Sequence, residues 1–269
     1  MRSLRSNLKL LSMFWQEAFQ YRPESFIWFL FDVVGPLVMI LMWRSAYGQA
    51  EQIGGYTQGQ MMLYYVGMMS LRTLLNVHPE WEISREIRTG DFSKHLLRPL
   101  RFNRYHFMGE MAWKLLRLLF LTPVVVLFLL WLGPEVLSGV GLTRETALLF
   151  VGSLVFGYLL CYYLKVALGL LAFWMTESIG VFNVFFMLQF LFEGSVMPLD
   201  LLPGWAQRVG EFLPFRYFYF LSLSIFQGKI DAVTAQQGLA AQALWCVGAY
   251  LAMRVVYGLG VRQYSAVGG

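Results

Sequence analysis

Long apolar runs separated by short polar stretches make up most of the sequence after the first 25 residues. Roughly 20 apolar residues are needed to cross a bilayer as a helix. The runs that reach this length cover 26–46, 60–78, 111–132, 146–174, 179–197 and 239–260. Because a backbone in lipid must satisfy its own hydrogen bonds, these runs are predicted to be helical. The pattern therefore predicts an all-α polytopic membrane protein, with six transmembrane helices in one domain over residues 1–269.

The first 22 residues form an amphipathic pattern instead of a span. Their apolar positions recur at helical spacing and are Leu4, Leu8, Leu11, Trp15 and Ala18. This spacing predicts a helix that lies on the cytosolic membrane surface, and Pro23 separates it from the first span. The helix is expected to act as a topological anchor or, alternatively, to contact a partner as well.

Composition agrees with a membrane protein. Hydrophobic residues make up 58% of the chain and charged residues 14%, against about 45–50% and about 25% in soluble domains. Cys161 and Cys246 both lie inside predicted spans, which argues against a disulfide framework. No small-residue cleavage site follows the first span, so we expect a retained helix and not a removed signal peptide.

Lys and Arg are distributed unequally between the two sides of the predicted membrane. Eleven lie in the N-terminal segment, the loop 79–109 or the C-terminal tail, and four lie in the opposite loops. Cytosolic loops carry the excess of Lys and Arg, so both termini are predicted to be cytosolic. The net charge of +5 is then explained by topology and by anionic lipid headgroups. Nothing in the sequence indicates a nucleic-acid partner.

The loop after the second predicted span is the most charged loop of the chain. Its basic residues are Arg85, Arg88, Lys94, Arg98, Arg101 and Arg104. Ile83 and Ile87 are four residues apart, so they share one face of a helix that Gly90 is placed to end. Glu82 and Glu86 form another face of this helix, beside Arg85 and Arg88.

A second short helix, 92–97, is expected in the same loop, with Asp91 as its cap and Pro99 as its end. Ordered charges around an apolar ridge are typical of a helix that binds a groove on another protein. Residues 81–100 are therefore predicted to dock a partner in the cytosol through Ile83 and Ile87. The alternative is an ordinary basic loop that only sets topology.

The stretch 193–228 is too broken to span the membrane and too apolar to be a free loop. The prolines that interrupt it are Pro198, Pro203 and Pro214. Trp205 belongs to a short amphipathic segment here, and we expect residues 198–215 to dip into the outer leaflet and return, packed against protein. A short helix lying flat at the interface is the alternative. Glu193, just before this segment, either marks an outer gate or caps the turn.

Charged side chains within predicted spans are costly in lipid and therefore informative. Asp32, Arg72 and Lys165 lie roughly 9–14 Å from the cytosolic ends of their spans, at about 1.5 Å per residue. We expect Asp32 to pair with Lys165 or Arg72 in the inner half of the bundle. Lys114 and Arg117 are expected to extend their charged ends to the inner interface.

Two groups of motifs resemble those of a known family. The cytosolic loop reads Ile87-Arg88-Thr89-Gly90 and then Leu96-Leu97-Arg98-Pro99-Leu100. The outer segment reads Gly194, Met197-Pro198-Leu199, Leu202-Pro203-Gly204-Trp205, Leu213-Pro214-Phe215 and Gly228. In this order, between these spans, they resemble the ABC-2-type permeases of bacterial ATP-driven exporters, in the branch with an I-x-x-G and L-x-x-P loop. The resemblance covers nearly the whole chain.

The resemblance implies a permease subunit in the bacterial inner membrane. Two permeases, identical or paralogous, would pair, and each would dock one ATPase subunit that carries the ATP and Mg²⁺. The family's coupling helix corresponds to Glu82–Gly90, and its re-entrant helices correspond to Met197–Phe215. The substrate path would be lined mainly by the first, second and fifth spans.

The sequence offers no chemistry of its own for energy coupling. A phosphate-binding loop needs G-x-x-x-x-G-K-[ST], and Gly228-Lys229 lacks the residues around it. His78, His95 and His106 are far apart in the sequence, so we expect neither a metal site nor a catalytic residue. The alternatives are a proton-coupled secondary transporter and a membrane-embedded lipid-modifying enzyme. Aromatic and Met residues on the lining spans favour an amphipathic or lipid-like substrate.

Overall fold

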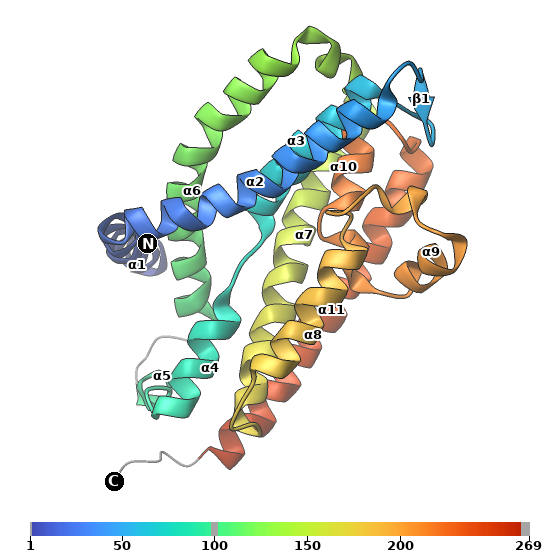
Figure 1. The fold of residues 1–269 in the computed structure, drawn as a ribbon. Helices are drawn as coiled ribbons and strands as arrows, with labels where there is room; N and C mark the ends of the chain where they lie inside the picture. The colour runs from blue at the N-terminus through green and yellow to red at the C-terminus, as the bar shows by residue number, and fades with distance from the viewer. Residues whose placement is uncertain (1, 98–101, 265–269) are drawn as a thin grey trace.

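A computed structural model describes residues 2–97 and 102–264, and most of them are helical (Figure 1). The first elements are α1 (Arg2–Gln20), α2 (Arg22–Tyr47), β1 (Gln52–Ile53), β2 (Tyr56–Thr57), α3 (Gln58–Leu75), α4 (Pro79–Thr89), α5 (Ser93–Leu97) and α6 (Phe102–Leu132). The others are η1 (Pro134–Gly139), α7 (Arg144–Leu170), η2 (Leu171–Phe173), α8 (Ile179–Phe192), η3 (Leu199–Leu201), α9 (Gly204–Glu211), η4 (Pro214–Tyr217), α10 (Phe220–Phe226) and α11 (Ala232–Gln263).

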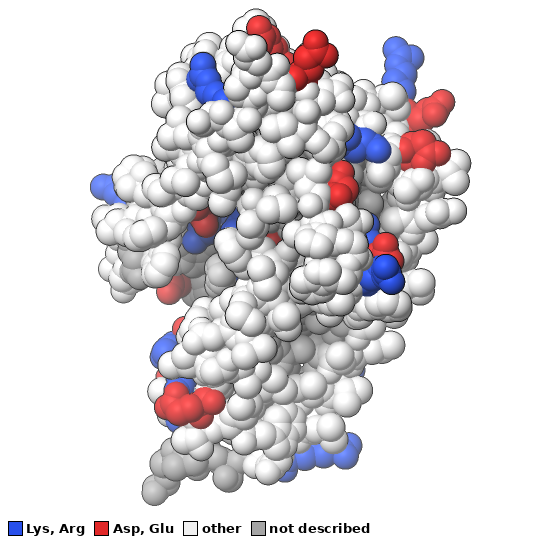
Figure 2. Space-filling model, turned by 45° about the vertical axis from the view of Figure 1, so that its right-hand side comes forward, with Lys and Arg blue, Asp and Glu red and all other residues white. Residues whose placement is uncertain are grey.

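Four helical stretches of the described chain are long and apolar enough to cross a membrane. They are Ser25–Tyr47, Phe102–Leu132, Arg144–Phe173 and Ala232–Gln263. At about 1.5 Å per residue, each exceeds the roughly 30 Å hydrocarbon core. Side chains without charge cover most of the face in Figure 2, and Lys, Arg, Asp and Glu form separate small groups at its two ends and along its edges. The fold is thus that of an all-α membrane protein, with one small hairpin, β1–β2.

The two other predicted spans are shorter helices than the sequence indicates. α3 ends at Leu75, three residues before the predicted end at 78, and α8 ends at Phe192 instead of 197. α3 is also enclosed by the chain itself, since residues 61–66 are all buried. It packs mainly against α2, α6 and η1. Burial in protein explains why α3 can carry polar groups along its length.

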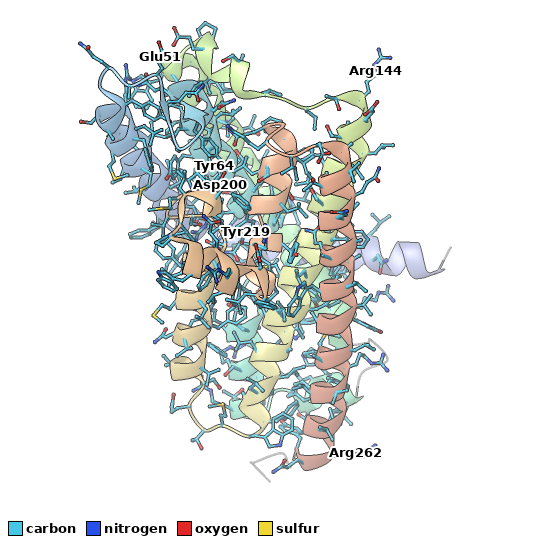
Figure 3. The ribbon with its side chains drawn as sticks, turned by 90° about the vertical axis from the view of Figure 1, so that its right-hand side faces the viewer. Glu51, Tyr64, Arg144, Asp200, Tyr219 and Arg262 are labelled. Carbon is cyan, nitrogen blue, oxygen red and sulfur yellow. The ribbon has the colours of Figure 1, made fainter. Side chains whose placement is uncertain are left out.

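α1 crosses the bundle sideways and packs on α6 (Figure 3). Leu10, Phe14 and Ala18 form its buried face, and the Phe14 ring meets Tyr105 edge-on at 4.9 Å. The predicted apolar face is therefore only partly right, because Leu8 is exposed and the buried face is turned toward α6. Pro23 lies in the first turn of α2, where a missing amide hydrogen costs nothing.

α7 and α11 form the most extensively packed helix pair of the described chain. α7 also approaches the chain after η4 very closely: a Cβ on Gly157 would lie 2.9 Å from the Phe218 carbonyl oxygen. In the same place, Gln242 of α11 donates its amide to the Ser153 and Tyr217 carbonyls at 3.0 and 2.7 Å. Small residues and buried hydrogen bonds thus hold α7, α10 and α11 together.

Between α8 and α10 the chain forms three short helices, each started by a proline. Pro198 precedes η3, Pro203 precedes α9, and Pro214 opens η4. The segment is fixed to α3, because Tyr64 and Tyr65 donate their hydroxyls to the carbonyls of Gly194 and Val196 at 2.7 and 2.9 Å. The apolar face of α9 remains uncovered, with Trp205 69% exposed.

Candidate functional site

The segment formed by α4 and α5, residues 79–97, lies at the same end of the molecule as the C-terminal end of α11, opposite the β1–β2 hairpin (Figure 1). Pro79 opens α4, where its ring suits the first helical turn. Gly90 ends the helix with φ of +81°, a left-handed conformation that favours glycine. The predicted boundaries of this helix agree with the structure at Gly90. Arg98, Pro99 and Arg101 lie outside the described residues.

The apolar ridge of α4 faces the chain's own helices. Ile83 is 0% exposed and Ile87 is also buried. α4 packs on α7 so closely that a Cβ on Gly169 would lie 2.8 Å from the Glu80 Cα and 3.1 Å from the Ile83 Cβ. The prediction that Ile83 and Ile87 seat in a partner's groove is therefore wrong. An apolar ridge is needed equally for docking and for intramolecular packing, and here α7 already covers it.

The outward face of the segment is charged. Glu82, Arg85 and Arg88 are exposed. Arg85 pairs with Glu82 and lies 3.8 Å from Asp91, and Arg88 lies 3.6 Å from Glu177, which precedes α8. Surface pairs of this kind add little stability, so their atoms remain available to a partner.

The α5 end of the segment adds two exposed leucines to this charged face. Leu97 is 86% exposed, and Leu96 is also exposed. Beside them, a hydrogen bond from Lys94 lowers the pKa of the Asp91 carboxyl, so this residue stays charged. The outward face of residues 79–97 therefore combines fixed charges with a small apolar end.

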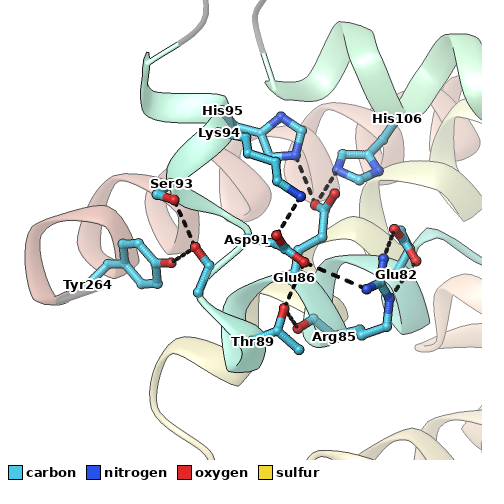
Figure 4. Close-up of polar contacts among 11 residues, drawn as sticks. Glu82, Arg85, Glu86, Thr89, Asp91, Ser93, Lys94, His95, His106 and Tyr264 are labelled. Carbon is cyan, nitrogen blue, oxygen red and sulfur yellow. Dashed lines mark hydrogen bonds and ion pairs between the residues drawn. The ribbon is translucent and has the colours of Figure 1, made fainter. Parts of the chain in front are cut away.

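Glu86 does not belong to the exposed face, contrary to its predicted place beside Glu82. It points inward, and its Oε2 atom lies 2.9 Å from His95 Nε2 and 3.2 Å from His106 Nε2 (Figure 4). All three side chains are buried. Burial acts to raise the pKa of Glu86, but the two imidazoles outweigh it and lower the pKa to about 2. We refer to Glu86, His95 and His106 as the Glu86 cluster.

Sequence reasoning missed the Glu86 cluster because its members are separated along the chain. The turn at Gly90 folds α5 back on α4 and places His95 against Glu86, and α6 supplies His106. The hydroxyl of Tyr264 donates to the Gly90 carbonyl at 2.9 Å, which holds the same turn from the C-terminal side (Figure 4). Separation along the sequence therefore does not exclude a site that His95 and His106 form together.

The charged residues within the spans pair differently from the prediction. Asp32 lies 3.3 Å from Arg117, not against Lys165 or Arg72. Lys165 is fully buried and donates to the Asn76 side chain and the Val77 carbonyl at 2.6 and 2.9 Å. Depth along a helix was predicted from the sequence, but the direction of each side chain around the helix was not.

Two lysines hold the C-terminal end of α3. Lys165 contacts residues 76 and 77, and Lys114 donates to the carbonyls of Thr73, at 3.0 Å, and Asn76. The last carbonyls of a helix carry partial negative charge and favour such cations. Lys114 is buried and Arg117 pairs with Asp32, so the predicted extension of both side chains to the inner interface is wrong.

Arg72 instead reaches the end of α8. Its guanidinium lies 3.0 Å from the Glu193 carboxylate and donates to the Ser195 hydroxyl at 3.0 Å. Gln189 donates to the second oxygen of Glu193 at 2.7 Å. A cavity of about 250 Å³ opens beside this pair, between α3 and α8, and Phe186 lies on its wall. The Arg72–Glu193 pair therefore joins α3 to the segment that follows α8.

A second cavity, of about 430 Å³, lies between α1, α4 and α6. Charged groups of both signs line it, including Glu17, Arg85, Glu110 and Lys114. His106 of the Glu86 cluster is also on its wall. This cavity therefore lies directly beside the Glu86 cluster.

Long apolar helices, a mainly apolar core with a few buried charges, and a charged segment at one end indicate a multi-pass membrane protein. Residues 33–268 match the family described as ABC-2 family transporter protein. Because this match covers most of the chain, the protein belongs to the ABC-2 family, and the resemblance predicted from the motifs is confirmed. Its class is the permease component of an ABC transporter, whose ATPase activity is in separate subunits. No curated protein matches the chain at a significant level.

Proposed function

We propose that this chain is the permease subunit of an ATP-driven exporter in a bacterial inner membrane. In this arrangement α2, α3, α6, α7, α8 and α11 are the six spans, and both termini are cytosolic. The surplus of Lys and Arg in the N-terminal segment and the loop 79–109 supports this orientation. α1 then lies along the inner surface, as its sideways position suits, and the pieces η3 to η4 lie in the outer leaflet.

The observation that carries the proposal is the outward face of residues 79–97. Its side chains Glu82, Arg85 and Arg88 are exposed while the opposite face of α4 is fixed on α7. A partner ATPase that binds here would contact charges that set orientation and specificity, and the exposed Leu97 would add an apolar contact. The buried side chains Ile83, Glu86 and Ile87 hold α4 in place from its opposite face.

The substrate path is proposed to follow α2, α3 and α8, where a second permease, identical or paralogous, completes it. Apolar side chains such as Phe31 on α2 and Met187 on α8 are exposed on these helices. The Arg72–Glu193 pair and the cavity of about 250 Å³ add polar groups between α3 and α8. A surface that is mainly apolar with one polar site supports an amphipathic or lipid-like substrate.

Co-expression tests this proposal. The chain would be expressed in turn with each ATP-binding-cassette subunit of its source bacterium that has no fused membrane domain. Each complex that is recovered would then be assayed for ATP hydrolysis in inverted vesicles. We expect one ATPase subunit to co-purify and to drive ATP-dependent accumulation of a fluorescent amphipathic lipid. Arg88→Glu with Arg85→Glu should reduce recovery of the ATPase at least tenfold. Accumulation driven by a proton gradient without any ATPase would favour the secondary transporter instead.

A further inference from the structure

The Glu86 cluster brings three metal-ligating atoms to one buried point at the base of the molecule. The two Nε2 atoms and the Glu86 carboxylate oxygen all lie within 4.8 Å of one another. The side chains of Glu86, His95 and His106 are 8%, 5% and 5% exposed. We propose that this cluster binds one divalent transition-metal ion, with Zn²⁺ as the best fit.

The distances in the Glu86 cluster suit a shared ion. Ligands at about 2.0–2.2 Å from a tetrahedral Zn²⁺ are separated from one another by about 3.3 Å. Glu86 Oε2 lies 2.9 Å from His95 Nε2 and 3.2 Å from His106 Nε2. Small shifts of the side chains would therefore place both nitrogens and the oxygen at bonding distance from one ion.

Hydrogen bonding accounts for only one of the two imidazoles. His95 Nε2 bonds with Glu86 Oε2 at 2.9 Å. His106 Nε2 lies 3.2 Å from the same oxygen but is too poorly aligned for a hydrogen bond, and it has none with the other described residues. A buried nitrogen without a hydrogen bond is costly, and coordination of an ion would satisfy it.

The chemistry of the Glu86 cluster selects the kind of ion. Two imidazoles with one carboxylate suit Zn²⁺ and its neighbours Co²⁺ and Ni²⁺, whereas Mg²⁺ and Ca²⁺ prefer oxygen ligands alone. His106 lies on the wall of the cavity of about 430 Å³, which provides an entry path and water for a fourth coordination position. The rings of Phe102 and Tyr105 pack on His95 at 5.3 and 5.1 Å and fix its orientation.

The ligands come from three separate helices, so a bound ion would have a structural consequence. Glu86 is on α4, His95 on α5 and His106 on α6. The ion would join these helices behind the outward face of residues 79–97 and would hold α5 against α4. This role is independent of the transported substrate and of any ATPase.

Metal binding can be measured on the full chain, purified in detergent with a tag that contains no histidine and stripped with a chelator. We expect one Zn²⁺ per chain by elemental analysis, and Co²⁺ should give the visible absorption of a tetrahedral nitrogen and oxygen site. His78→Gln is the control, since His78 is the remaining histidine and contacts Glu80 instead. It should leave stoichiometry and spectrum unchanged.

A matched pair of variants separates coordination from hydrogen bonding. His106→Gln retains a hydrogen-bonding side chain but is a poor ligand, so bound Zn²⁺ should fall at least tenfold. His106→Glu retains a ligand but places two carboxylates together, so Zn²⁺ should raise its unfolding temperature. The proposal is overturned if the wild-type chain takes up neither ion, or if His106→Gln binds Zn²⁺ as the wild type does. If neither variant can be purified, the wild-type Co²⁺ spectrum with its His78→Gln control decides alone.

Discussion

Replacing Ile83 should destabilise the permease itself and leave its partner surface intact. Ile83 is 0% exposed and packs where α4 meets Gly169 of α7. Truncation of a fully buried isoleucine costs about 2–5 kcal/mol. Because α4 already contacts Gly169 closely, it cannot shift to fill the cavity that a smaller side chain would leave. We therefore expect Ile83→Ala to lower the free energy of unfolding by about 3 kcal/mol. For a chain of this size, this corresponds to a fall of about 6–12 °C in the unfolding midpoint.

Arg88→Glu on the same helix is the matched control. Arg88 is exposed and its ion pair with Glu177 is long, at 3.6 Å, so its replacement should change stability by less than about 0.5 kcal/mol. Thermal unfolding of purified variants in detergent measures the first effect. Pull-down of the co-expressed ATPase, normalised to the folded fraction of each permease, measures the second.

The two variants should therefore give opposite results. Ile83→Ala should lower the unfolding midpoint and still recover the ATPase in proportion to folded protein, whereas Arg88→Glu should unfold normally and recover much less. An Ile83→Ala variant with an unchanged midpoint and no bound ATPase would refute this reasoning. It would mean that the apolar ridge of α4 leaves α7 and enters the partner.

Substitutions at three further positions, Asp32, Glu193 and Gly90, test two ion pairs and one turn of the fold. Asp32→Ala should lower the free energy of unfolding by about 2 kcal/mol, because it leaves the partly buried guanidinium of Arg117 unpaired. Adding Arg117→Ala to this variant should restore part of the unfolding midpoint, whereas adding Lys165→Ala should not. Glu193→Ala should cost about 3–5 kcal/mol, because it breaks a buried pair; a midpoint equal to that of the wild type would contradict the pairing. Gly90→Ala should cost about 1–2 kcal/mol through its left-handed backbone, and an unchanged thermal midpoint for this variant would mean that the turn relaxes.

The sequence predicted the limits of the helices in residues 79–97 better than it predicted what these helices pack against. Pro79 and Gly90 determine where α4 begins and ends through local backbone chemistry, so its limits follow from the residue types alone. Tertiary packing decides what the apolar ridge of Ile83 and Ile87 contacts. No local sequence signal distinguishes packing on α7 from packing on a partner protein. The choice between them required the structure.

The same limit applies to the polar residues inside the bundle. Position along a helix gave Asp32 and Lys165 similar depths, but their direction depends on how each helix is rotated against the next. The early end of α3 was also not evident, because Asn76 and Val77 carry no strong helix-breaking signal. Once that end is known, the positions of Lys114 and Lys165 follow from the exposed carbonyls.

The end of α3 has a mechanical consequence for force transmission. Only residues 76–78 separate α3 from α4, and Lys114 and Lys165 bind the carbonyl groups of this short connection. A displacement of α4 is therefore transmitted almost directly to α3. It must either shift α3, with α6 and α7 following through their lysines, or break hydrogen bonds in a buried site. Through Tyr64 and Tyr65, the same movement would be passed to the Gly194 and Val196 carbonyls, which follow α8.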